Sequence, residues 1–457
     1  MFKIGGQKVA ARTLGLFLCD VGILVAAVLV AATLPGRFDG FRTVLRFIVV
    51  VIFCIPSLHY NGLYDYQVLR QLTELFVRLL RALVIASAAI ALFYYLFPIV
   101  SFGRMVAVIA APIVFISMLG ARLILEHTGA VRPRAERVLI LGTDGIGIAL
   151  ARETGERPEL ATHVVGFLEE RGTGLGTSLA NPGIIGAIAE LQQVVDAYKV
   201  DRIVLAMSER RGTMPVDDLL HLKMAGIRIE DARSCYERLI GRILLERLSP
   251  SWFILSDGFR KSRFLTIAKR SLDIIFALIG LLLSSPLMAA AALAIWCETG
   301  RPLLFRQKRV GLNGKEFEIL KFRSMRKDAE AGGPAWATGT DSRITPVGAF
   351  LRKYRLDELP QLLTVLSGEM SLVGPRPEQP HFCKLLLRNI PYFDQRHSVR
   401  PGITGWAQIN YRYGATVNES KVKLELDLFY IKNLSVFLDL AILFETGKVM
   451  LIGRGSR

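Results

Sequence analysis

The hydrophobic residues gather in long runs near the N-terminus. Four apolar runs follow one another there, at about residues 14–34, 44–59, 79–99 and 104–121. A helix rises about 1.5 Å per residue, so about 20 apolar residues cross a bilayer. Buried helices of a water-soluble bundle are the alternative, but four such runs in series are typical of membranes. The pattern predicts a four-helix transmembrane region over residues 1–130, with the first run a retained helix and not a signal peptide.

A fifth apolar run, residues 272–296, has basic residues on both flanks. Ser285 and Pro286 lie near its midpoint. Proline removes a backbone donor, and a serine hydroxyl can satisfy the carbonyl that is freed. We therefore expect a re-entrant helix that enters the membrane, breaks at Ser285-Pro286 and returns to the same face. The alternative is a kinked helix that crosses the membrane.

Between residues 136 and 250, short apolar strands alternate with helical stretches, which predicts a parallel sheet covered by helices, a Rossmann-like domain. Its glycine-rich turn, residues 142–147, is an incomplete dinucleotide fingerprint, because Asp144 holds the place of the second glycine and would repel a phosphate. An oligomerisation or structural role is the default expectation. Binding of NAD, of a nucleotide-sugar or of a regulatory ligand is the alternative.

A linker, residues 251–262, leads to the last region, residues 263–457, for which we expect a mainly helical α+β domain. Apolar and polar residues alternate on both sides of Asn313-Gly314, which predicts a β-hairpin. Lys321 and Arg323 bracket one residue and are expected to share a strand face, which makes them candidates for phosphate binding. Anionic lipid headgroups would explain most other cations of this segment.

Two adjacent carboxylates, Asp357 and Glu358, precede Pro360. Proline is tolerated only in the first turn of a helix, so a helix should begin close to Asp357 and stabilise an anion there. With Arg352 and Arg355 upstream, these residues suit phosphoryl transfer. One carboxylate can attack phosphorus, the other can hold Mg²⁺, and arginines can neutralise phosphate charge. The alternative is that Asp357 caps a helix and Glu358 faces solvent.

Two later segments offer further donors. Arg376 lies between two prolines, which fix its backbone in an extended form that suits either an aimed guanidinium or a structural turn. Residues 399–410 form a glycine-rich loop with donors for a nucleotide.

Composition and charge narrow the range of partners. The 457 residues carry a net charge of +17 and are 52% hydrophobic, which excludes a disordered chain and a simple soluble enzyme. The basic residues lie beside apolar runs, so a surface of anionic lipids is a simpler partner than nucleic acid. Their placement around the first four runs puts both ends of that region in the cytoplasm. The cysteines are scattered and predict neither a metal cluster nor a disulfide framework: Cys19, Cys54, Cys235, Cys297 and Cys383.

The C-terminal motifs resemble the bacterial sugar transferase family, the polyprenyl-phosphate hexose-1-phosphate transferases. The motifs are KRSLDI at 269–274, Ser-Pro at 285–286, FRQKRVGLNGKEFEILKFRSM, RKYRLDELPQL, MSLVGPRP and VRPGITGWAQIN. They cover nearly all of the last 195 residues in order. The preceding regions resemble the large members of the family, which initiate exopolysaccharide or O-antigen assembly.

The resemblance implies a two-step transfer at the cytoplasmic face of the bacterial inner membrane. Asp357 would attack the β-phosphate of a UDP-sugar and release UMP, and undecaprenyl phosphate would then accept the phosphosugar. Asp357 and Glu358 would hold Mg²⁺. The other site residues implied are phosphate-binding Arg352, Arg376, Lys321 and Arg323, and nucleotide-binding Arg400, Pro401 and Gln408. The family also uses a re-entrant helix broken at Ser-Pro.

The sugar stays open among glucose, galactose and an N-acetylated sugar, and a homodimer through the middle domain is a further expectation. A catalytically silent membrane scaffold for a polysaccharide assembly complex is the main alternative. It accounts for the helices and the basic surface but not for the adjacent carboxylates. An oxidoreductase or epimerase acting through the middle domain is another.

Overall fold

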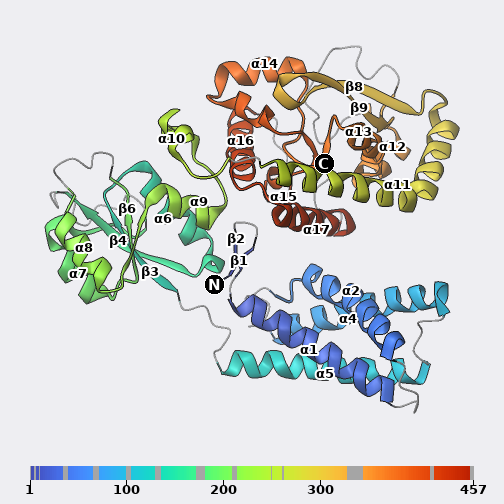
Figure 1. The fold of residues 1–457 in the computed structure, drawn as a ribbon, viewed down its shortest axis with the longest axis horizontal. Helices are drawn as coiled ribbons and strands as arrows, with labels where there is room; N and C mark the ends of the chain where they lie inside the picture. Colours follow the sequence, from blue (N-terminus) through green and yellow to red (C-terminus); the bar gives the residue numbers. More distant parts are fainter. Residues whose placement is uncertain are drawn as a thin grey trace. The chain divides into compact units, whose positions relative to one another are not determined.

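The structure is a computed structural model, and it describes residues 2–4, 7–9, 11–33, 40–64, 72–98, 104–128, 135–170, 181–207, 214–248, 250–259, 262–326, 343–411 and 416–452. The chain folds into two compact units. The first contains the N-terminal helices, and the second contains the parallel sheet and the C-terminal region (Figure 1).

The helices predicted in the first 130 residues are confirmed as α1 (Ala11–Thr33), α2 (Gly40–Tyr60), α4 (Leu72–Leu96) and α5 (Arg104–His127). Two short paired strands, β1 (Phe2–Ile4) and β2 (Gln7–Val9), precede them. Leucines such as Leu24, Leu58 and Leu79 form the shared core. A buried ion pair joins α1 to α5, because Arg122 donates to both carboxylate oxygens of Asp20 at 2.8 and 2.9 Å.

Among the described residues, four helices are long and apolar enough to cross a membrane: Arg42–Tyr60, Leu72–Leu96, Ala110–His127 and Arg263–Thr299. A shorter apolar stretch, Gly15–Val30, lies within α1. Large apolar side chains also lie on exposed helix faces, as at Val84 and Ile116. These features are those of a membrane protein.

The predicted parallel sheet is confirmed, with strand order β5-β4-β3-β6-β7. Its strands are β3 (Glu136–Leu141), β4 (Thr162–Glu169), β5 (Ile184–Ala187), β6 (Arg202–Leu205) and β7 (Arg228–Asp231). The intervening helices are α6 (Gly145–Glu156), α7 (Leu191–Tyr198), α8 (Val216–Met224) and α9 (Ala232–Ile240), with 3₁₀ turns η2 (Pro158–Leu160) and η3 (Ile188–Glu190).

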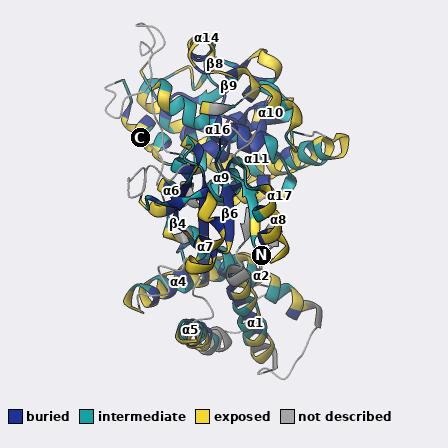
Figure 2. Ribbon diagram, turned by 90° about the vertical axis from the view of Figure 1, so that its left-hand side faces the viewer, coloured by how far each residue is buried: buried dark blue, intermediate teal, exposed yellow. Residues whose placement is uncertain are grey.

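Both faces of this sheet are covered, which explains why its central strands β3 and β6 are mostly apolar. Val138 and Ile140 of β3 pack in one cluster with residues of α6 and α9. Leu139 and Leu141 point the other way and pack with residues of α7 and α8. Strand β6 is accordingly drawn mainly in the colour of buried residues (Figure 2).

The C-terminal region is mainly helical and contains two small sheets. Its helices are α10 (Pro250–Leu255), α11 (Arg263–Thr299), α12 (Pro346–Lys353), α13 (Gln361–Ser367), α14 (Pro380–Asn389), α15 (Trp406–Asn410), α16 (Val417–Lys432) and α17 (Val436–Ile452). Its strands are β8 (Leu304–Val310), β9 (Glu316–Phe322), β10 (Ser371–Val373) and β11 (Gly402–Thr404). Its 3₁₀ turns are η4 (Leu245–Arg247), η5 (Leu312–Gly314), η6 (Leu356–Glu358) and η7 (Phe393–Ser398).

The hairpin predicted at Asn313-Gly314 is confirmed, because β8 and β9 pair antiparallel on either side of it. Both turn residues have a positive φ, 55° at Asn313 and 75° at Gly314. Asparagine and glycine tolerate this left-handed conformation best, which explains why the chain reverses here.

Helix α11 differs from the prediction in one respect. It is one continuous α-helix from Arg263 to Thr299 with Pro286 inside, so the predicted break at Ser285-Pro286 is wrong, and the helix bends along its course (Figure 1). Pro286 lacks the amide that would donate to the carbonyl of Leu282. The hydroxyl of Ser285 donates to that carbonyl at 2.8 Å instead, as the sequence predicts. The position of the helix relative to a membrane stays a prediction.

Candidate active site

The two adjacent carboxylates lie on a 3₁₀ turn that joins α12 to α13. Arg355 precedes the turn with a left-handed backbone, φ 54°, which reverses the chain direction after α12. Pro360 is the N-cap of α13, and the helix begins at Gln361. The sequence predicts a helix start close to Asp357, and the α-helix begins four residues after that residue. The acidic pair is held on the turn before it.

Glu358 is surrounded by three cations. Its Oε1 atom accepts from Lys321 Nζ at 3.2 Å and from Arg376 NH2 at 2.8 Å, and its Oε2 atom lies 3.7 Å from Arg355 NH1. Burial alone would raise the pKa of Glu358. Arg376 and Lys321 outweigh that effect and hold the pKa well below its usual value. Glu358 is therefore a fixed anion.

Asp357 has the opposite surroundings. It is 8% exposed, and within the described part of the chain no hydrogen bond reaches its carboxylate. Burial and then the neighbouring charge of Glu358 raise its pKa, against the lowering effect of Lys321, Arg352 and Arg376. The turn thus carries one carboxylate engaged by cations and one that is free to react.

The structure brings Lys321, Arg352 and Arg376 to this pair but not Arg323. Strand β9 ends at Phe322, so Arg323 no longer follows the alternation that would place it beside Lys321. Its guanidinium donates to the hydroxyl of Thr299 and, at 2.6 Å, to the carbonyl of Gly300. Arg323 holds the C-terminal end of α11.

The predicted nucleotide-binding residues make other contacts. Arg400 Nε donates to the carbonyl of Gly368 at 2.9 Å, at the end of α13 that is remote from the acidic pair. The carbonyl of Pro401 accepts from the amide of Ser371 at 2.9 Å, and Gln408 donates within its own loop. None of these contacts, within the described residues, joins the loop to the acidic pair, so nucleotide binding by these residues stays a prediction.

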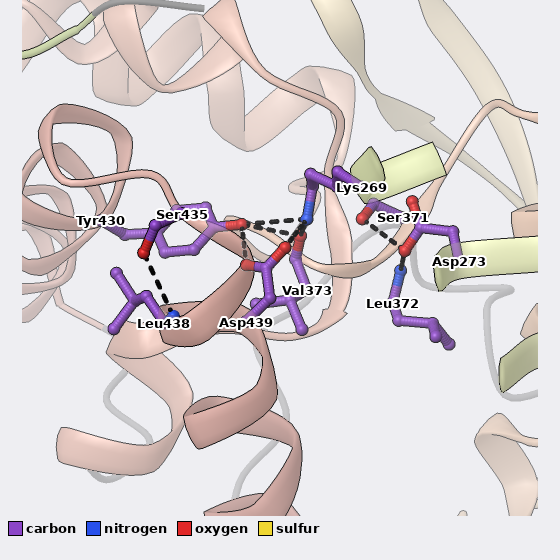
Figure 3. Close-up of polar contacts among 9 residues, drawn as sticks. All are labelled: Lys269, Asp273, Ser371, Leu372, Val373, Tyr430, Ser435, Leu438 and Asp439. Atoms are coloured by element: carbon purple, nitrogen blue, oxygen red, sulfur yellow. Dashed lines mark hydrogen bonds and ion pairs between the residues drawn. The ribbon is translucent and has the colours of Figure 1, made fainter. Parts of the chain in front are cut away.

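Helix α11 anchors the strand that precedes Arg376 (Figure 3). Asp273 Oδ1 accepts from the hydroxyl of Ser371 and the amide of Leu372, both at 2.9 Å. One turn earlier, Lys269 Nζ donates to the carbonyl of Val373 at 2.9 Å. All three residues of β10 are therefore held by two side chains of α11.

A second set of contacts fixes Lys269 in place (Figure 3). Lys269 Nζ lies 2.6 Å from Asp439 Oδ2 on α17. Tyr430 on α16 donates its hydroxyl to the other oxygen of Asp439 at 2.7 Å. The sequence alone assigned no role to these residues. Lys269 and Asp273 contact partners that lie between 98 and 170 residues away along the chain. The signal in the sequence was the KRSLDI motif at 269–274, which contains Lys269 and Asp273.

The backbone of the segment between β10 and Arg376 lies directly against the backbone of β11. Strands β10 and β11 run parallel, and the amide of Gly374 donates to the carbonyl of Thr404 at 2.8 Å. A Cβ atom on Gly374 would lie 2.4 Å from the carbonyl oxygen of Arg400. Glycine is required here because the two backbones approach too closely for any side chain.

The donors for a divalent cation are limited. The described residues contain no group of three or more His, Cys, Asp or Glu side chains that could hold a metal ion. Mg²⁺ commonly takes one or two protein carboxylates together with substrate phosphates. Asp357 and Glu358 supply carboxylate oxygens of the type that Mg²⁺ prefers, and in this structure Glu358 is paired with Lys321 and Arg376.

Residues 59–222 match a family model described as a CoA-binding domain. A ligand with phosphate groups would be expected at the glycine-rich turn between β3 and α6. The amide of Gly145, which begins α6, donates to the carboxylate of Asp144 at 2.6 Å. The carboxylate therefore lies where a phosphate would meet a helix start, and the two anions would repel. The residues of this turn do not fit a bound phosphate.

Residues 264–453 match the family model of the bacterial sugar transferases. The chain is 41% identical over 239 residues to the UDP-N-acetylgalactosamine-undecaprenyl-phosphate N-acetylgalactosaminephosphotransferase of Aeromonas hydrophila, which covers 52% of this chain and 56% of that protein. It is 32% identical over 351 residues to the undecaprenyl-phosphate glucose phosphotransferase of Komagataeibacter xylinus, 75% of this chain and 64% of that protein. The chain thus spans less than two thirds of each of these relatives.

A third relative is shorter. An exopolysaccharide production protein of Rhizobium leguminosarum bv. phaseoli is 41% identical over 186 residues, which covers 39% of this chain and 93% of that protein. The match to nearly all of this relative, together with the family model over residues 264–453, shows that the chain belongs to the bacterial sugar transferase family.

Proposed function

We propose that the protein transfers a hexose-1-phosphate from a UDP-sugar to undecaprenyl phosphate. The observation that carries this proposal is the contrast between Asp357, whose carboxylate is free, and Glu358, which is held by Lys321, Arg355 and Arg376. Adjacent carboxylates with such different surroundings take different roles in one site. The names of the relatives, which specify undecaprenyl phosphate and a sugar phosphotransferase, support the substrate class.

In the first step, a carboxylate oxygen of Asp357 attacks the β-phosphorus of the UDP-sugar. A bond forms between that oxygen and phosphorus, and the bond from phosphorus to the bridging oxygen of the diphosphate breaks. The bridging oxygen keeps the electron pair and leaves with UMP. Lys321, Arg352 and Arg376 neutralise negative charge on the phosphoryl oxygens as the bond breaks.

In the second step, a phosphate oxygen of undecaprenyl phosphate attacks the same phosphorus. The bond to Asp357 breaks, the carboxylate is restored, and the sugar leaves on a lipid diphosphate. Glu358 does not react, because it is held as the anion that keeps Lys321 and Arg376 in place. Mg²⁺, held by Asp357 and Glu358, would neutralise diphosphate charge when bound.

The contacts of α11 support a re-entrant helix in the inner membrane. Lys269 and Asp273 near its start and Thr299 at its end all contact the same C-terminal region. Between them, Leu282 and Leu283 are 74% and 73% exposed. An apolar helix whose two ends stay on one folded region can enter the bilayer and return to one face. The positive-inside rule places that face in the cytoplasm.

Release of UMP from a panel of UDP-sugars tests the proposal. Membranes that contain the protein should release UMP continuously only when undecaprenyl phosphate is present, because without it the reaction stops after one UMP per protein, and Asp357→Asn should abolish UMP release. Asp217→Asn, an exposed carboxylate on α8, is the matched control and should turn over at the wild-type rate. A wild-type protein that releases no UMP from any UDP-sugar would instead be a scaffold, and activity in Asp357→Asn would show that another group is the nucleophile.

A further inference from the structure

A second buried ion pair lies directly behind Arg376. Arg396 on η7 and Asp427 on α16 are 5% and 2% exposed. The NH2 group of Arg396 donates to Asp427 Oδ2 at 2.8 Å and to the backbone carbonyl of Arg376 at 3.0 Å. One nitrogen therefore connects a buried carboxylate to the residue that contacts Glu358.

Burial of this pair needs a reason other than stability. Taking two charges out of water costs several kcal/mol per ion, and replacing a buried pair with apolar residues of similar volume is often neutral or stabilising. Burial itself raises the pKa of Asp427 to about 6, although Arg396 opposes the shift. The charge-assisted bond to the carbonyl of Arg376 is what an apolar pair would not supply.

The geometry of the turn makes this carbonyl important. Prolines on both sides restrict the backbone of Arg376, so the position of its carbonyl largely sets the direction of its side chain. The next carbonyl, of Pro377, accepts from Arg309 NH1 at 3.1 Å. The guanidinium of Arg396 is itself held over the ring of Phe393, 4.9 Å from its centroid.

We propose that Arg396 and Asp427 are positioning residues that hold the Arg376 carbonyl, so that the Arg376 guanidinium stays at the acidic pair during phosphoryl transfer. Neither residue touches the reacting atoms. The inference rests on the proposed transferase function. It assigns a role to a buried pair 31 residues apart in the chain that the motif pattern did not single out.

The first test replaces the pair with apolar residues. The double variant Arg396→Met/Asp427→Leu removes both charges and should keep the thermal unfolding midpoint close to wild type. Its kcat for UMP release should fall about 10- to 100-fold, with KM for the UDP-sugar changed less than about 3-fold, because small misplacements of a catalytic group have such effects. Wild-type kcat in this variant would overturn the proposal.

The second test is a double-mutant cycle with Arg376→Ala. Once the guanidinium of Arg376 is absent, its direction no longer matters, so adding Arg396→Met/Asp427→Leu should slow the reaction less than about 3-fold further. Effects that multiply would overturn the proposal, because they would show that the pair acts independently of Arg376. Arg396→Lys, which keeps a charged donor, serves in the same cycle if the apolar variant does not fold.

The matched control is a partly buried carboxylate that also accepts from arginine. Glu230→Gln in the parallel sheet weakens the contacts from Arg202 and Arg238 and should lower the unfolding midpoint but not kcat. An inactive wild-type protein would refute the proposed function. If the wild type is active but the losses of kcat from Arg376→Ala and from Arg396→Met/Asp427→Leu multiply, only the positioning role is refuted.

Discussion

Arg376 and Glu358 are 18 residues apart in the chain, yet Arg376 NH2 donates to Glu358 Oε1 at 2.8 Å. The contact joins the turn after β10 to the 3₁₀ turn after α12. It holds Glu358, the carboxylate beside Asp357, as a fixed anion, and it leaves the guanidinium of Arg376 beside the acidic pair, where the proposed mechanism requires phosphate to bind.

Substitutions of Arg376 can separate the contribution of its positive charge to catalysis from that of its planar guanidinium group. Arg376→Lys keeps the positive charge but loses the planar fork that contacts two oxygens at once, and lysine is not equivalent at such a site. We expect kcat for UMP release to fall about 10- to 100-fold in Arg376→Lys and further in Arg376→Ala. Steady-state assays over a range of UDP-sugar concentrations measure this. Wild-type activity in Arg376→Lys would contradict a role for the fork, and equal activity in the two variants would contradict a role for the charge.

The anchor between α11 and β10 should matter for stability. Asp273→Ala leaves the Ser371 hydroxyl and the Leu372 amide without their acceptor, which costs about 1–3 kcal/mol of unfolding free energy for each buried group left unpaired. Ser371→Ala removes one of these two bonds and should cost less. Thermal unfolding of both variants in detergent gives the order. A larger cost for Ser371→Ala would contradict the assignment of both bonds to Asp273.

The bend of α11 allows a prediction about compensation. Ser285→Ala removes the donor to the Leu282 carbonyl, which should lower stability by about 1 kcal/mol. Pro286→Ala restores a backbone amide at that carbonyl. Ser285→Ala should therefore cost less in the Pro286→Ala background than alone, as a double-mutant cycle of unfolding midpoints would show. Equal costs would mean that the serine hydroxyl does not replace the missing amide.

Stability should depend on pH through His397. Burial, and then the charge of Arg396, lower the pKa of His397 from 6.5 to about 4. Between these values the unfolded chain binds a proton that the folded chain does not, so stability rises as pH rises through this window. Relative to wild type, His397→Gln should gain about 1–2 kcal/mol less stability between about pH 5 and about pH 7.5. Unfolding midpoints at the two pH values measure this, and an identical pH response in the two proteins would contradict it.

Local patterns in the sequence predicted most of the elements. Hydrophobic runs, strand alternation and the Asn-Gly turn depend on neighbours in the chain. Helices α1, α2, α4 and α5, the parallel sheet and the β8–β9 hairpin follow from them. The proximity of Lys321 to Glu358 was anticipated only as a shared role in phosphate binding. The effect of Pro286 was overestimated as a break, because Ser285 compensates for the missing amide within the helix.

Contacts over long sequence separations were not predictable in this way. Arg323 was expected beside Lys321, but the strand ends one residue earlier and the side chain contacts the end of α11. Asp273, Arg396 and Asp427 support the site from elements that the pattern treats as separate. Their roles depend on tertiary packing, which the spacing of residues does not record.

The anchoring of β10 on α11 also limits how the protein can be handled. Removing the apolar helix to obtain a water-soluble catalytic fragment would remove Lys269 and Asp273 with it. The strand that leads to Arg376 would lose the partners of Ser371, Leu372 and Val373. Deletion of α11 would therefore disrupt the candidate active site. A soluble form would instead need polar substitutions at exposed apolar positions of α11, such as Leu282 and Leu283, with the contacts of Lys269 and Asp273 kept.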